Sequence, residues 1–207
     1  MKFLKRNLII LISIFLTIIG YITYTMLVDN GEAIDLEQSA SQVLEDVERV
    51  KNQETAYTWL ETKNMSDGYL ETHLSDMTQR QRIPENVIQF LFGTILVDDP
   101  ELFVQAFDTE TISKDLFAID NPDKLEVASD IMNRISRDSK LERVGIINTK
   151  GSVGQEVTVR IAISYSDGLE IKFPITMRLQ RNSHGEDNSI YFISSSVWDL
   201  IKVIESK

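Results

Sequence analysis

The stretch VTVRIAISYSDGLEIKFPITMRL, residues 157–179, carries the clearest structural pattern in this chain. In each half, apolar and polar residues alternate with a period of two, which predicts two antiparallel strands with one buried face. A two-residue turn would set the apolar face of one strand against the polar face of the other. A three-residue turn, Ser166-Asp167-Gly168, aligns the two apolar faces, and we therefore predict it, with Gly168 in the left-handed conformation.

This turn also predicts the register of the hairpin. The expected facing pairs are Ile163 with Ile171, Ile161 with Phe173, and Val159 with Ile175. Pro174 has no backbone N–H, so we expect it at a bulge or on a sheet edge. Two further strands are expected to flank the hairpin, near residues 141–148 and 189–197. Residues 198–204 are apolar enough for either a short helix or a strand.

Upstream of the sheet, apolar residues recur every three or four positions, which predicts helices. A first helix is expected to start at Asp35, whose side chain can cap it, and to continue weakly to Leu60. Pro84 opens a second helix. Asp99-Pro100 and Asn121-Pro122 each pair a capping residue with proline, a combination typical of helix starts. The stripe that follows the last of these marks a strongly amphipathic helix: Leu125, Ala128, Ile131, Met132 and Ile135.

Residues 7–28 contain no charged residue. About 20 apolar residues span the hydrocarbon core of a bilayer, and only a helix satisfies its backbone there. The run is longer than the apolar core of a signal peptide and ends without a small-x-small cleavage site, which favours a retained anchor. Basic residues precede it and acidic residues follow it. We therefore expect a cytoplasmic tail at 1–6, a transmembrane helix at 7–28 and an extracytoplasmic domain at 29–207.

The composition excludes several functional classes. The formal net charge is −11, and every acidic residue follows residue 28, so the domain would repel nucleic acid and direct nucleic-acid binding is not expected. The chain has no cysteine, which excludes disulfides, thiol chemistry and lipid attachment at a cysteine. A single domain of this length can bury a sufficient core without such a cross-link.

No catalytic, cofactor-binding or metal-ligating residue is predicted. The two histidines, His73 and His184, stand in polar segments without the three or four N or S ligands that zinc requires. Asp98 and Asp99 could pair for acid–base chemistry, but Asp99 before Pro100 is better explained as a helix cap. Phosphate loops, nucleophile elbows and dinucleotide fingerprints are absent from the sequence. Cofactors and an enzymatic activity are therefore not expected.

The order of elements is a short basic tail, an apolar run, helices, and then long antiparallel strands. In its outer domain this order resembles the nuclear-transport-factor-2-like fold, an α+β fold with helices packed on a curved antiparallel sheet. In full layout and length it resembles the bitopic scaffold subunit of type IV secretion systems, including the conjugation machines of Gram-positive bacteria. Gram-negative members carry Asn-Pro-x-Gly, whereas Asn121-Pro122-Asp123-Lys124 lacks the glycine.

That resemblance implies a non-enzymatic subunit whose outer domain forms homo-oligomers and docks other membrane channel subunits. The expected contact with the lipid bilayer runs through residues 7–28. Two other classes stay open: a ligand-binding or sensory module of the cell envelope, and an accessory domain of cell-wall machinery. A cluster of polar residues facing into a hollow domain would favour the sensor, whereas an interior filled by apolar side chains would favour the scaffold.

Overall fold

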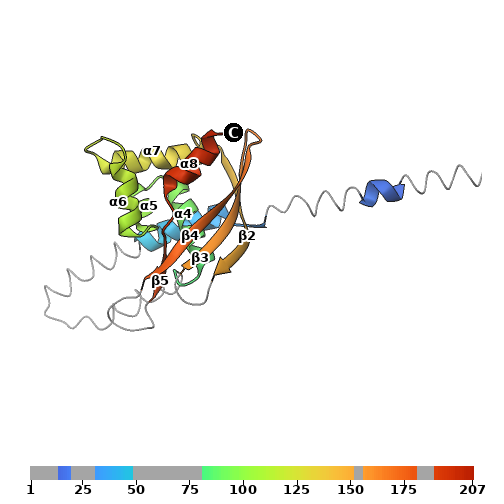
Figure 1. The fold of residues 1–207 in the computed structure, drawn as a ribbon, viewed down its shortest axis with the longest axis horizontal. Helices are drawn as coiled ribbons and strands as arrows, with labels where there is room; N and C mark the ends of the chain where they lie inside the picture. The colour runs from blue at the N-terminus through green and yellow to red at the C-terminus, as the bar shows by residue number, and fades with distance from the viewer. Residues whose placement is uncertain (1–13, 20–30, 49–80, 152–155, 181–188) are drawn as a thin grey trace, which may run out of the picture. The chain divides into compact units, whose positions relative to one another are not determined.

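The computed structural model describes residues 14–19, 31–48, 81–151, 156–180 and 189–207. The chain divides into two compact units, Met1–Asn30 and Gly31–Lys207. The second unit is an α+β domain built on one open antiparallel sheet. Figure 1 shows its helices gathered on one side of long, twisted strands.

The sheet has five strands that follow one another in chain order from β1 to β5, each antiparallel to the next. Their bounds are β1 (Glu32–Ala33), β2 (Leu141–Gly151), β3 (Glu156–Tyr165), β4 (Glu170–Gln180) and β5 (Ile190–Ile193). From β2 to β5, strands that follow one another in sequence are neighbours in space and are joined by short connections, whereas residues 34–140, with α4 to α7, lie between β1 and β2.

The predicted register of the β3–β4 hairpin is confirmed. Ile163 pairs with Ile171, Ile161 with Phe173 and Val159 with Ile175. The turn closes through a hydrogen bond of 2.9 Å from the Gly168 N–H to the Tyr165 carbonyl. Gly168 has φ of 86°, a conformation that glycine adopts without steric cost.

Pro174 lies opposite Arg160 in β3 without a break in register, so it does not form a bulge. On its other side, β5 pairs with β4 only from Met177 to Gln180. Pro174 therefore lies on a section of β4 that has no strand partner on that side among the described residues. The expected edge position is confirmed, because an edge does not require the missing N–H.

Helices flank the strands in sequence. Residues 36–48 are helical, and then follow α4 (Pro84–Val97), α5 (Pro100–Gln105), α6 (Thr109–Phe117), α7 (Lys124–Ser136) and α8 (Val197–Glu205). The predicted caps Asp35 and Asp99 are confirmed: their carboxylates accept from the Gln38 and Leu102 N–H groups at 2.9 and 3.0 Å. The weak continuation of the first helix to Leu60 lies outside the described residues.

Two predicted boundaries are wrong. The Asn121-Pro122 pair does not start a helix: Asn121 Oδ1 accepts from the Asp123 N–H at 2.9 Å, which forms a turn. Asp123 is the true N-cap of α7, and its carboxylate accepts from the Leu125 and Glu126 N–H groups. The last strand ends at Ile193, before the predicted limit, because Ser196 caps α8 by accepting from the Trp198 N–H.

One apolar core joins the inner face of the sheet to the helices. Residues that are wholly shielded from solvent come from α4, α7 and β3, among them Ile88, Phe92, Ala128, Ile131, Val159, Ile161 and Ile163. Helix 36–48 packs closely on α4 at Gly93, where a Cβ atom would lie 2.8 Å from the Ser39 carbonyl oxygen. Any larger residue at position 93 would push the two helices apart.

The expected fold class needs a correction, because it placed a transmembrane helix at residues 7–28 ahead of the domain. Among the described residues, no helix is both long enough and apolar enough to cross a membrane. Crossing requires about 20 residues in one helix. The described helical part of that run covers only residues 14–19, and the rest of it lies outside the described residues.

Candidate functional site

The acidic pair singled out in the sequence is divided between two helix ends. Asp98 ends α4 with φ of 59°, in the left-handed region, and its N–H donates to the Ile95 carbonyl at 3.3 Å. Asp99 caps α5 with its side chain. Asp98 therefore ends one helix and Asp99 starts the next. Helix capping is the structural alternative to acid–base chemistry that the sequence offered for Asp99.

The two histidines, His73 and His184, lie outside the described residues, as does the loop 181–188 that contains His184. The same holds for residues 152–155 of the glycine-containing turn after β2. Within the described ranges, acidic residues form no group that could hold a metal ion.

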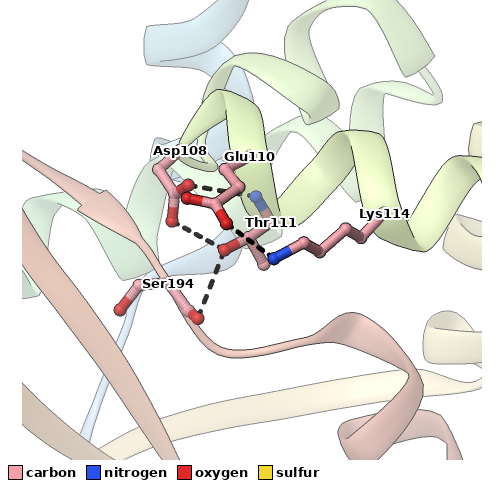
Figure 2. A network of polar contacts seen from close by, with 5 residues as sticks. All are labelled: Asp108, Glu110, Thr111, Lys114 and Ser194. Carbon is pink, nitrogen blue, oxygen red and sulfur yellow. Dashed lines mark hydrogen bonds and ion pairs between the residues drawn. The ribbon is translucent and has the colours of Figure 1, made fainter.

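The structure instead brings polar side chains together where α6 meets the end of β5. Asp108 caps α6 and is 4% exposed. Its Oδ1 accepts from the Thr111 N–H at 3.0 Å, and its Oδ2 lies 2.7 Å from the Thr111 hydroxyl. That hydroxyl also lies 3.4 Å from the Ser194 carbonyl oxygen, as Figure 2 shows. The Asp108 N–H donates to the Ile193 carbonyl at 3.0 Å, which fixes α6 to the end of the sheet.

A second buried carboxylate lies about two helical turns further along α6. Asp115 is 5% exposed. Its Oδ1 accepts from the Ser196 hydroxyl at 2.7 Å, and its Oδ2 accepts from the Val197 N–H at 2.8 Å. Its backbone carbonyl accepts from the indole N–H of Trp198 at 2.9 Å. One residue of α6 thus binds three consecutive residues at the start of α8.

We call Asp108, Thr111, Asp115, Ser194 and Ser196 the α6 junction. A serine hydroxyl beside a carboxylate is one element of a nucleophilic site. In the junction, both oxygens of Asp115 accept from donors at the N-terminus of α8, where a negative charge is favoured by the helix dipole. The geometry is therefore that of two helix caps, and its effect is to hold α6, β5 and α8 together.

Charges at the surface of α6 interact more weakly. Glu110 and Lys114 form an exposed pair at 2.6 Å (Figure 2). The hydrogen bond from Lys114 lowers the pKa of Glu110 and raises that of Lys114. Exposed pairs of this kind contribute little to stability, because solvent screens them.

Tyr165 is a titratable group buried in the apolar core. Its hydroxyl donates to the Ile135 carbonyl at 2.8 Å, so β3 is tied to the end of α7. Burial raises the pKa of Tyr165, because the phenolate would lose its hydration. The Arg137 guanidinium lies 5.3 Å from the ring centre.

Apolar side chains leave little space at one cavity between the described helices and the sheet. The cavity there has a volume of about 10 Å³ and is lined mostly by apolar side chains, including Leu91, Phe107, Ile135, Phe173 and Leu200. That is about the space of one water molecule, far below the several hundred Å³ typical of ligand pockets. Larger hollows open to solvent: about 110 Å³ beside helix 36–48 and α4, and about 460 Å³ at the α6–α7 loop.

Sequence reasoning did not find the α6 junction. Asp108 had a usable signal, since aspartate three residues before Thr111 is a capping pattern. Asp115 had none, because its partners Ser196 and Val197 are 81 and 82 positions away.

No protein-family model, curated protein or solved structure matches this chain. The resemblance to nuclear-transport-factor-2-like scaffold subunits therefore stays a prediction. The function has to be inferred from the geometry of the molecule itself.

Proposed function

We propose that the unit Gly31–Lys207 is an assembly module that acts through contacts with other proteins and not through a chemical site. The observation that carries this proposal is the packing between the described helices and the sheet, where a cavity of about 10 Å³ leaves no room for a ligand. By the criterion drawn from the sequence, a filled apolar interior favours a scaffold over a sensor.

The buried polar groups support the same conclusion. Asp108 and Asp115 are both nearly inaccessible, and both cap helices. A group that must meet a substrate has to be reachable, whereas a cap is best shielded from competing water. Asp108 and Asp115 thus stabilise the folded domain, and we expect partner proteins to bind its surface.

The specific assembly we propose is a type IV secretion channel of the conjugative kind, in which this domain is a scaffold subunit. The supporting observation is the order of elements, with helices first and a long antiparallel meander after them. Contact of residues 7–28 with a lipid bilayer, and an extracytoplasmic position of the domain, stay predictions. Fractionation of cells expressing the full chain, compared with a chain lacking residues 1–30, tests both.

The test of the scaffold role is crosslinking in intact cells, followed by affinity capture and identification of the captured subunits, with DNA transfer between cells measured in parallel. Deleting residues 31–207 should abolish both capture and transfer. Alanine at His73, His184, Asp98 and Asp99 should change neither. Loss of transfer on a single histidine substitution, with capture intact, would show that a chemical site had been missed.

A further inference from the structure

We propose that the loop between α6 and α7 is a docking site for a partner protein, which places a basic side chain and a neighbouring apolar side chain against the ring of Phe117. This inference rests on the proposed assembly function and names the chemistry of one partner. It follows from the exposure of the loop, from the contacts that hold it in place and from its charge. We call residues 117–126 the Phe117 loop.

The Phe117 loop exposes apolar side chains. Phe117 is the last residue of α6 and is 72% exposed, more than any other large apolar side chain among the described residues. Ala118, Pro122 and Leu125 are exposed as well. Phe117, Ala118 and Pro122 line the hollow of about 460 Å³. Figure 1 shows this loop at the end of the helical layer, away from the long strands. Single exposed apolar residues are ordinary, but several of them around one hollow indicate a binding surface.

The ring of Phe117 is held in place before any partner arrives. The Lys124 ammonium lies 4.4 Å from the centre of the ring, which is a cation–π contact. The same ammonium donates to the Ile119 carbonyl at 3.2 Å, so the lysine side chain bridges the loop. A side chain that is already ordered loses less conformational entropy when a partner binds.

The backbone of the loop is also fixed by hydrogen bonds. The Asn121 N–H donates to the Ile119 carbonyl at 2.9 Å. The Asn121 side chain donates to Glu126 Oε2 at 3.1 Å and accepts from the Asp123 N–H. The loop therefore presents its exposed side chains on a preformed surface, which is what a docking site requires.

The charge of the loop favours a basic partner. The loop contains three acidic residues, Asp120, Asp123 and Glu126, against one basic residue, Lys124. Asp120 lines the hollow and is exposed, and its carboxylate forms no hydrogen bond or ion pair within the part of the chain that the structure describes. An arginine or lysine of a partner can pair with this carboxylate. An apolar neighbour of that side chain can then pack on the ring of Phe117.

Other occupants fit the loop less well. The hollow is open to solvent, whereas a site for a small molecule encloses most of its ligand. A second copy of this chain would bring the same acidic residues and a net charge of −11, so like charges would repel. Anionic lipid is repelled for the same reason. We therefore expect a different protein with a basic segment.

Binding of a defined peptide tests the proposal. The full chain, in nonionic detergent, carries fluorinated phenylalanine, and the signal of Phe117 is the one lost in Phe117→Leu. One probe is a blocked hexapeptide of alternating arginine and leucine, and the other has glutamate in place of arginine. In fluorine NMR the Phe117 signal should move saturably with the arginine peptide and stay in place with the glutamate peptide. Movement with neither peptide up to millimolar concentration, or equal movement with both, would overturn the proposal.

Three variants separate the loop from the general negative charge of the chain, with affinity for the labelled arginine peptide measured by fluorescence anisotropy. Phe117→Ser should weaken binding at least fivefold, because the ring supplies the apolar contact. Asp120→Asn should weaken it about threefold, the usual size of an exposed charge pair. The matched control, Asp199→Asn, removes an exposed carboxylate from the first turn of α8 and should leave the affinity unchanged. Equal weakening by Asp120→Asn and Asp199→Asn would show that the peptide follows net charge, and the proposal would be wrong. Circular dichroism checks that each variant folds.

Crosslinking in cells identifies the partner. Photoreactive benzoylphenylalanine in place of Phe117 should crosslink a protein other than this chain, at a segment that contains arginine or lysine beside an apolar residue. The same group in place of Leu96, which is 42% exposed on α4, should give several-fold less of that product. Crosslinks to copies of this chain alone, or to lipid alone, would contradict the proposal.

The outcomes for the loop and for the assembly role are distinguishable. If Phe117→Ser captures channel subunits as well as the original chain does, the docking site lies elsewhere and the assembly role stands. If the original chain captures no channel subunit, yet its Phe117 signal moves with the arginine peptide alone, the assembly role fails and the loop remains a binding site for basic segments.

Discussion

The β3–β4 hairpin and the α6 junction are both well ordered by hydrogen bonds, but they differ in how far apart their partners are in sequence. In the hairpin, the turn Ser166-Asp167-Gly168 brings neighbouring strands into register. In the junction, Asp115 of α6 binds Ser196, 81 positions later. Local pairing can be derived from period and turn chemistry, whereas a pair that distant forms only when the whole domain has folded.

Replacing the buried carboxylate of Asp115 in the α6 junction should have the largest effect on the free energy of unfolding. Asp115→Ala removes the acceptor of the Ser196 hydroxyl and the Val197 N–H, and a buried donor without a partner is costly. We expect a loss on the order of 3 kcal/mol in the free energy of unfolding. Urea denaturation followed by tryptophan fluorescence measures it.

The matched control for that substitution is Asp123→Ala, which removes an exposed cap from α7. It should cost about 1 kcal/mol, the usual value for an N-cap. Equal losses at the two positions would show that burial of the Asp115 contacts adds nothing.

Substitution in the turn should break the hairpin with a smaller effect. Gly168→Val places a branched side chain at φ of 86°. The expected cost is about 1–2 kcal/mol, from the steric penalty of the left-handed region. Ser166→Val, in the same turn at negative φ, is the comparison, and denaturation of both variants decides whether conformation or residue size is responsible. If the two variants lose the same amount of stability, the argument that the turn requires glycine at position 168 is wrong.

Tyr165 ties the β3–β4 hairpin to the end of α7 and gives the stability of the domain a pH dependence. Because burial raises its folded pKa above the unfolded value near 10, the folded state holds the phenolic proton more tightly. Its contribution is fully present below pH 10 and is lost as pH rises above it. The free energy of unfolding should fall by about 1 kcal/mol between pH 10 and 11.

Tyr165→Phe isolates that effect. The variant should lose about 1 kcal/mol at neutral pH, from the hydrogen bond to the Ile135 carbonyl. It should also show less of the alkaline decline than the original chain. Parallel declines in the two proteins would assign the effect to other groups.

The smallest effect is expected at the exposed edge of the junction. Lys114→Ala should raise the pKa of Glu110 toward its ordinary value, because the hydrogen bond and the positive charge that lower it are gone. The melting temperature should stay unchanged within error, since both groups are exposed. Carboxyl titration by NMR reads the pKa, and an unchanged value would remove Lys114 as its cause.

The two proline pairs show how far local signals reach. Asp99-Pro100 starts α5 as predicted, because the aspartate side chain caps the helix that the proline opens. Asn121-Pro122 carries the same signal, yet the asparagine side chain accepts from the Asp123 N–H in a turn before the helix, and Asp123 caps α7. The local sequence is compatible with either Asn121 or Asp123 as the N-cap of α7. Packing of α7 on the core selects Asp123. The apolar run at 7–28 is a similar case, since hydropathy predicted a spanning helix that the described residues do not contain.

The period of two in residues 157–179 and the glycine at 168 dictate the hairpin, its register and its buried face, because strand geometry and a left-handed turn depend only on near neighbours. The stripes at three- and four-residue spacing dictate helices in the same way. Tertiary structure alone decides that Asp108 and Asp115 become buried caps, that a cavity of only about 10 Å³ is left between the described helices and the sheet, and that Lys150, Arg160 and Lys172 form one row. These features join side chains from separate elements, and no local preference specifies which elements will meet.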